Sequence, residues 1–155
     1  MSTPTLDIRN LSVSYSTPRG ELKALRNVSI QIPNKKIVGI VGESGCGKST
    51  LISAISKLMA TNATVKSGEI EFHNSDILKI SNQQMSELLG TDISLVFQDP
   101  MQTHNPVLSI GRQMVDIQFR DRLSKVEKYN RASEMLSLVG IPDAEERLKQ
   151  YPFEF

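Results

Sequence analysis

The stretch of sequence that decides the fold is Gly42-Glu43-Ser44-Gly45-Cys46-Gly47-Lys48-Ser49. It matches the pattern G-x-x-x-x-G-K-[S/T], in which each fixed residue has a chemical task. The glycines let the backbone turn sharply and bring successive N–H groups onto phosphate oxygens. Lys48 supplies a positive charge for the β- and γ-phosphates, and Ser49 offers a hydroxyl group to Mg²⁺. A helix that begins near Lys48 directs its positive end at the same anion.

This phosphate loop predicts a set of nucleotide-binding residues. They are Gly42, Glu43, Ser44, Gly45, Cys46, Gly47, Lys48, Ser49 and Thr50. Cys46 occupies a variable position of the pattern, and we interpret it as a small tolerated residue without a redox role. The alternative interpretation is a glycine-rich turn that joins a strand to a helix and binds nothing.

The residues on both sides of the loop decide between these interpretations. Residues 37–41 form a continuous apolar run, which is typical of a parallel strand buried on both faces. Residues 49–60 carry apolar side chains at helical spacing, which predicts a helix. A loop between a buried strand and a helix is the context that the phosphate-binding pattern requires, so the sequence favours a nucleotide site.

Further elements are predicted by periodicity and by turn residues. Strands are expected at residues 6–8, 11–15, 28–32, 68–72 and 93–97. Helices are expected at residues 81–89, 110–123 and 126–138, with Ser81 as a cap of the first and Gly140 and Pro142 after the last. The chain changes from strand-rich to helical near Asn105, which is the candidate subdomain boundary.

The composition excludes several classes of protein. The 155 residues carry a formal net charge of +1, from 18 basic and 17 acidic side chains, which gives no support for a nucleic-acid partner. No apolar run approaches the roughly 20 residues that span a bilayer, and the N-terminus lacks a stretch of signal-peptide type. Any membrane role is therefore expected to come through a partner. Cys46 is the only cysteine, so no intramolecular disulfide is expected, which fits the cytosol.

Three further segments distinguish among the proteins that use such a loop. Tyr15 lies in LSVSYSTPRGELKALRNVS, Gln98 lies in ISLVFQDPMQTHNP, and the last segment is IPDAEERLKQYPFEF. With these segments the chain resembles the ATP-binding subunits of ABC transporters, most closely the importers of oligopeptides, dipeptides and nickel. The expected cofactors are accordingly ATP and Mg²⁺. A nucleotide kinase is disfavoured by the first two segments.

The resemblance implies roles for two residues outside the loop. Tyr15 matches the aromatic residue that stacks on adenine, although an ordinary strand aromatic is the alternative. Gln98 matches the glutamine that reaches Mg²⁺ and the attacking water, and the alternative is a polar strand terminus. The implied catalytic residues are therefore Gln98 and Lys48, and the implied metal ligands are Ser49 and Gln98.

The resemblance also implies a domain plan. The expected fold is α/β, a P-loop NTPase of the ABC type with an antiparallel β-subdomain. Residues 1–105 would form the nucleotide-binding core, and residues 106–155 would begin a helical subdomain that stops before the signature motif. The family's Walker B aspartate, catalytic glutamate and switch histidine have no counterparts here. Because the family places strands of its C-terminal half between them, residues 37–41 and 93–97 should not pair with each other.

The function implied by the resemblance is to couple ATP binding and hydrolysis to the import of peptides or nickel. The expected partners are transmembrane permease subunits, a second ATP-binding subunit in a homodimer or heterodimer, and indirectly an extracytoplasmic solute-binding protein. The expected location is the cytoplasmic face of the cell membrane. The alternatives are a non-hydrolysing nucleotide-binding fragment and an ABC ATPase without a transport function.

Overall fold

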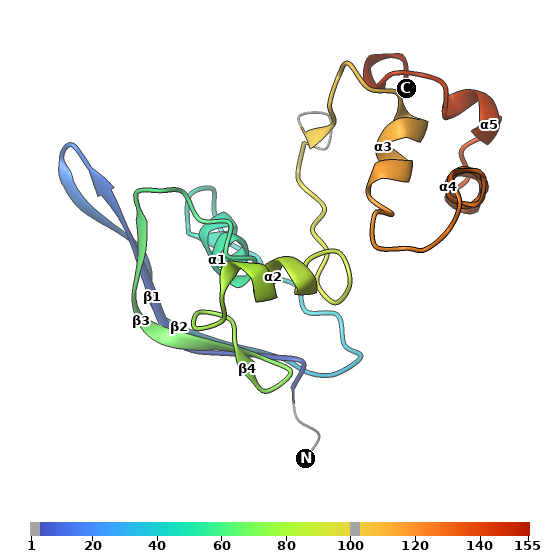
Figure 1. The fold of residues 1–155 in the computed structure, drawn as a ribbon. Helices are drawn as coiled ribbons and strands as arrows, with labels where there is room; N and C mark the ends of the chain where they lie inside the picture. Colours follow the sequence, from blue (N-terminus) through green and yellow to red (C-terminus); the bar gives the residue numbers. More distant parts are fainter. Residues whose placement is uncertain (1–3, 100–102) are drawn as a thin grey trace. The chain divides into compact units, whose positions relative to one another are not determined.

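The computed structural model describes residues 4–99 and 103–155, and the chain divides into two compact units, residues 1–94 and 95–155 (Figure 1). The boundary between the units falls after Ser94 in the chain, upstream of the composition change at Asn105. The first unit contains β1 (Leu6–Thr17), β2 (Gly20–Ile32), α1 (Lys48–Ile55), β3 (Ala63–Phe72), β4 (Ser75–Asp76) and α2 (Asn82–Leu88). The second contains α3 (Ile110–Asp116), α4 (Lys125–Leu138), α5 (Ala144–Arg147) and a short 3₁₀ helix (Pro152–Glu154).

The first unit is built on a four-stranded antiparallel sheet in the order β2-β1-β3-β4. The predicted antiparallel β-subdomain is therefore confirmed. β1 is one strand rather than two short ones, because Asn10 adopts a positive φ of 50° and the register shifts there without ending the ladder. His73 and Asn74 both have positive φ and form the two-residue turn between β3 and β4, which suits the twist of a tight hairpin.

One face of this sheet carries the core. Leu11 and Val13 of β1 are fully buried, and they share an apolar cluster with Leu51 of α1 and Met85 of α2. Both helices thus cover the same face of the sheet (Figure 1). α2 begins at Ser81, whose hydroxyl accepts the N–H of Gln84 while the Gln84 side chain accepts the N–H of Ser81, so the predicted cap is confirmed.

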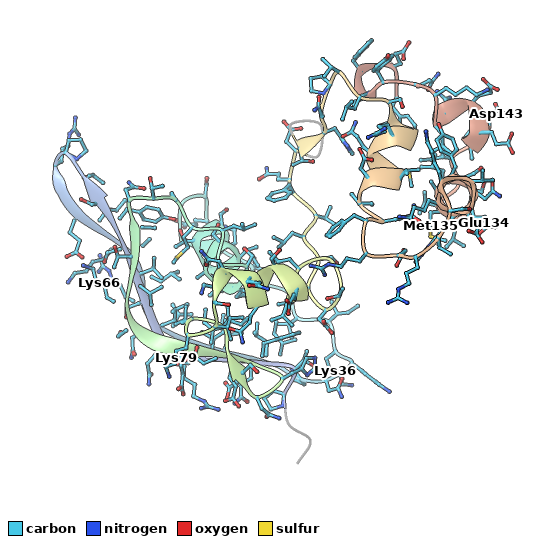
Figure 2. All side chains as sticks on the ribbon, in the orientation of Figure 1. Lys36, Lys66, Lys79, Glu134, Met135 and Asp143 are labelled. Carbon is cyan, nitrogen blue, oxygen red and sulfur yellow. The ribbon has the colours of Figure 1, made fainter. Side chains whose placement is uncertain are left out.

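The other face of the sheet is polar. Lys66 of β3 lies there (Figure 2), and its ammonium group is 2.8 Å from the carboxylate of Glu21 on β2. The hydrogen bond from Lys66 lowers the pKa of Glu21. Ser12 and Ser14 of β1 line the same surface. This alternation of apolar and polar residues along β1 is what a sheet packed on one side requires.

Two predicted strands are wrong. Residues 37–41 form no strand, and Ile37 and Val41 are fully exposed. Residues 93–97 form only an isolated bridge, from Ile93 to Leu89, and Val96 is exposed. A strand needs a neighbour that accepts its backbone hydrogen bonds, and neither run has such a ladder within the described residues. Because neither run is a strand, the expectation that they do not pair stays a prediction.

Two predicted helices are shorter than expected. α1 ends at Ile55 because Lys57 turns into the left-handed region at φ 53°. α3 ends at Asp116, and the side-chain amide of Gln118 donates to the carbonyl of Met114, which closes the last turn. Helices are nevertheless present at both predicted places, as α3 and α4.

The second unit has a core of its own. The buried residues are Ile110, Ala132, Leu136, Ala144 and Leu148. The first N–H groups of α3 are satisfied from the far end of the unit, because Ile110 donates to the carbonyl of Gln150 and Gly111 to that of Leu148, both at 2.8 Å.

Candidate functional site

The phosphate loop leads directly into α1, as predicted. Gly47 precedes the first residue of the helix and has a φ of 101°, and its carbonyl accepts the N–H of Leu51 at 2.9 Å. Within the loop the N–H of Cys46 donates to the carbonyl of Glu43 at 3.3 Å. The sequence therefore folds locally as a tight turn that opens a helix, although the run before it is not a strand.

Gly47 also fixes where the loop lies on the sheet. A Cβ atom at this position would come within 2.8 Å of both the Ala24 carbonyl oxygen and the Leu25 side chain of β2. Glycine is thus required twice, for its positive φ and for this close approach. Single-sequence reasoning does not identify Ala24 and Leu25 as the support of the loop, because nothing in their local pattern marks them.

Lys48 places its charge over the loop. Its ammonium nitrogen donates to the carbonyl oxygens of Gly42 at 2.7 Å and Glu43 at 2.6 Å. It also lies 3.5 Å from the sulfur of Cys46. The cation therefore stands at the start of α1, where the free N–H groups of the helix already favour an anion. No acidic residue lies in the first turn of α1 to oppose an anionic ligand.

Ser49 and Thr50, the next residues, have different surroundings. Ser49 is exposed, so its hydroxyl is accessible to a metal ion bound at the loop. Thr50 is buried, and its hydroxyl oxygen lies 3.1 Å from the hydroxyl oxygen of Tyr15. The loop, with its glycines and an exposed hydroxyl next to a lysine, fits a magnesium-bound phosphate chain.

Tyr15 reaches this turn from β1. It is half-buried, and its backbone pairs with Leu22 of β2 and Ala63 of β3. The structure thus brings together Tyr15, the loop and Thr50, which are far apart in the sequence. The contact of the Tyr15 ring with a base stays a prediction.

Gln98 belongs to the second unit. Its side chain is exposed, and it lies in a loop rather than at the end of a strand. Asp99, which follows it, is also exposed. Residues 100–102 of the same segment lie outside the described residues. The role that the resemblance implies for Gln98 therefore stays a prediction.

Together the sheet, the loop and the helix define a P-loop domain of the α/β class. A sequence model of the ABC transporter family matches residues 25–155. The chain belongs to the ABC transporter family, and the predicted fold class is confirmed.

Within this family, the chain is similar to ATP-binding proteins of peptide transport. The chain is 43% identical, over 97% of its length, to the dipeptide transport ATP-binding protein DppD of Bacillus subtilis. It is 39% identical, over 99% of its length, to the oligopeptide transport ATP-binding protein OppD of the same organism. The chain spans 45% and 43% of the length of these two relatives.

Solved structures support the fold. A dimeric ATP-binding cassette in a post-hydrolysis state, bound to ADP and Pi, matches 97% of the chain with a TM-score of 0.78 at 22% identity, and the match covers 62% of that cassette. A Clostridium perfringens protein that is part of the ABC transporter complex cbiONQ matches 96% of the chain, and 54% of its own length, with a TM-score of 0.68 at 26% identity. Within residues 4–99 and 103–155, every helix is too short or too polar to cross a bilayer.

Proposed function

We propose that this chain is part of an ATP-binding subunit of a peptide importer and that it binds magnesium–ATP at residues 42–50. The observation that carries the proposal is the position of Lys48, whose ammonium group lies over a glycine loop at the beginning of α1. A cation, free helix N–H groups and a loop open to phosphate oxygens favour the same ligand. The names of the two relatives, a dipeptide and an oligopeptide transport protein, support the cargo.

Residues 42–49 each have a proposed task. The backbone N–H groups of Gly42, Glu43, Ser44, Gly45 and Gly47 would donate to the phosphate oxygens. The N–H of Cys46 would join them by giving up its hydrogen bond to the Glu43 carbonyl. Lys48 exchanges its two loop carbonyls for oxygens of the β- and γ-phosphates. The hydroxyl of Ser49 would be a ligand of magnesium, which would neutralise charge on the phosphate chain when bound.

Residues outside the loop complete the site. The ring of Tyr15 stacks on the base, which suits the face of an aromatic side chain. On the family resemblance alone, Gln98 would be a ligand of the metal and would orient the attacking water. Phosphoryl transfer needs little covalent chemistry from a protein beyond positioning and charge stabilisation, so the lysine and glutamine are the proposed catalytic residues. We expect the 155-residue polypeptide alone to bind ATP without measurable turnover, because we identify no general base in it.

The subunit works with partners in this proposal. Two ATP-binding subunits form a dimer, and the dimer acts on permease subunits at the cytoplasmic face of the membrane, while an extracytoplasmic binding protein delivers the solute. The dimeric state of the solved cassette supports the pairing of ATP-binding subunits. Nickel is a second candidate cargo on the sequence resemblance alone.

Nucleotide binding is tested with one pair of lysine variants. The affinity for magnesium–ATP, measured by calorimetry on the 155-residue chain, should be lost in Lys48→Ala. Lys23→Ala is the matched control, since Lys23 is an exposed lysine on β2 of the same unit, and it should bind like the wild type. An unchanged affinity in Lys48→Ala would refute the site.

The cargo is tested in cells. Deletion of the coding gene in the source organism should abolish uptake of labelled dipeptides and oligopeptides, and the wild-type gene should restore it while the Lys48→Ala gene should not. If the deletion abolished nickel uptake and left peptide uptake intact, nickel would replace peptides as the proposed cargo. Intact uptake of all these solutes would refute the transport role.

A further inference from the structure

The hydroxyl groups of Tyr15 and Thr50 join two parts of the first unit. Tyr15 belongs to β1 and Thr50 to the first turn of α1, and their oxygens are 3.1 Å apart. A tyrosine ring on a strand turns about two side-chain torsions, and its χ2 well is broad. A bond to the hydroxyl at the far end of the ring removes most of that freedom.

Thr50 is a firm anchor for the ring. The residue is 8% exposed, and branching at Cβ restricts its χ1 torsion. In a helix a threonine hydroxyl commonly bonds a carbonyl of the preceding turn, but this hydroxyl is directed to Tyr15. Tyr15 itself is only half-buried, so the residue is held at its hydroxyl end without being closed off from solvent.

We propose that Thr50 is a positioning residue that orients the Tyr15 ring for the base of a purine nucleoside triphosphate. This inference rests on the proposed function, since it assigns the base of the same nucleotide. Thr50 follows Lys48 by two positions, so one turn of α1 carries the phosphate-facing lysine and also holds the ring. The ring is ordered before the nucleotide arrives, and binding does not have to order it again.

The test separates the base from the phosphates. The dissociation constants of magnesium–ATP and magnesium–tripolyphosphate are measured on the 155-residue chain, and their ratio reports what the nucleoside adds. Tyr15→Phe keeps the ring and removes its hydroxyl, and Thr50→Val keeps the shape of the threonine. Each should lower the preference for ATP about threefold to tenfold, the range expected for one neutral hydrogen bond. The double variant should lose no more than either single variant.

Control variants exclude simpler explanations. Thr50→Ser retains a hydroxyl and should keep most of the preference. Tyr129→Phe in the second unit and Thr64→Val on the polar face of β3 make the same chemical changes, and both should leave the ratio unchanged. Thr64 pairs with Ser14, the residue before Tyr15, so it also controls for a general disturbance of the sheet. If the role of Thr50 were purely structural, Thr50→Val would weaken the binding of ATP and of tripolyphosphate equally. The ratio of their dissociation constants would then be unchanged.

Two different failures can be told apart. Suppose that the wild-type chain binds ATP and that Lys48→Ala does not. If Tyr15→Phe then keeps the wild-type preference for ATP over tripolyphosphate, this inference alone is overturned. The same holds if the double variant loses the sum of the two single losses. A wild-type chain that binds neither ligand would overturn the proposed function and this inference with it.

Discussion

Gly47 and Ala24 approach each other so closely that a Cβ atom on residue 47 would lie 2.8 Å from the carbonyl oxygen of residue 24. At this contact the end of the phosphate loop packs directly against β2. The position of the loop is therefore set by the β-subdomain as well as by the helix that follows it.

We predict that Gly47→Ala destabilises the chain and abolishes ATP binding. The positive φ alone costs about 1–2 kcal/mol for a residue with a side chain, and the overlap with Ala24 adds about 1–3 kcal/mol. Gly20→Ala is the matched control, because Gly20 also has a positive φ, of 113°, but a Cβ there meets nothing within 4 Å. Urea unfolding of both variants measures the difference, and equal losses of unfolding free energy would show that the contact with Ala24 contributes nothing.

We predict that alkylation of Cys46 blocks nucleotide binding. Cys46 is exposed, and its sulfur lies 3.5 Å from the ammonium nitrogen of Lys48, so an adduct would occupy space that the phosphates need. Bound ATP should in turn slow the labelling. Mass spectrometry of the thiol adduct, with and without saturating ATP, provides the measurement. Labelling at the same rate in both conditions would count against the site.

We predict that Ile37→Ser changes the unfolding free energy of the 155-residue chain by no more than about 0.5 kcal/mol, because the side chain is fully exposed. Leu51→Ala, at a residue that is 3% exposed, should cost about 2–5 kcal/mol. Chemical denaturation of the two variants compares them. A loss of several kcal/mol in Ile37→Ser would mean that residues 37–41 are buried in solution.

We predict an acid-sensitive contribution from the cap of α4. The carboxylate of Glu127 accepts the N–H of Ser124 at 2.7 Å, and the Ser124 hydroxyl accepts the N–H of Glu127. Hydrogen bonds with the side chain and backbone of Ser124 lower the pKa of Glu127 below its ordinary 4.5. A carboxyl group with a lowered pKa stabilises the folded state fully above its unfolded pKa, and that stabilisation is lost as the pH falls through the folded pKa.

The capping prediction is checked with Glu127→Gln, which keeps an acceptor oxygen but does not titrate. Between about pH 6 and about pH 3 the wild type should lose more stability than the variant. Parallel pH dependences of their thermal midpoints would contradict the prediction.

The sequence predicted the parts of the fold that local chemistry determines. The phosphate loop, the helix after it and the capped α2 follow from turn residues, spacing and caps. The antiparallel sheet was implied by the family resemblance, and it is present. Residues 37–41 and 93–97 were predicted as strands from their apolar character, and this was wrong. Apolar character favours burial, but a strand forms only where a neighbouring strand completes its hydrogen bonds.

In the candidate site, too, some features follow from local sequence and others depend on the fold. The loop residues could be identified from their spacing, because phosphate binding needs those residue types in that order. The contact between Gly47 and Ala24 and the bond between Tyr15 and Thr50 could not, since each joins residues that only the fold brings together.

The two hydrogen bonds from the Lys48 ammonium group to backbone carbonyl oxygens have a thermodynamic consequence. A free lysine side chain carries roughly 2 kcal/mol of rotamer entropy, and these bonds restrict it in the unliganded chain. The side chain therefore has little freedom left to lose when phosphate arrives. The lysine changes acceptors instead of becoming ordered, so its share of the binding free energy should be mainly enthalpic.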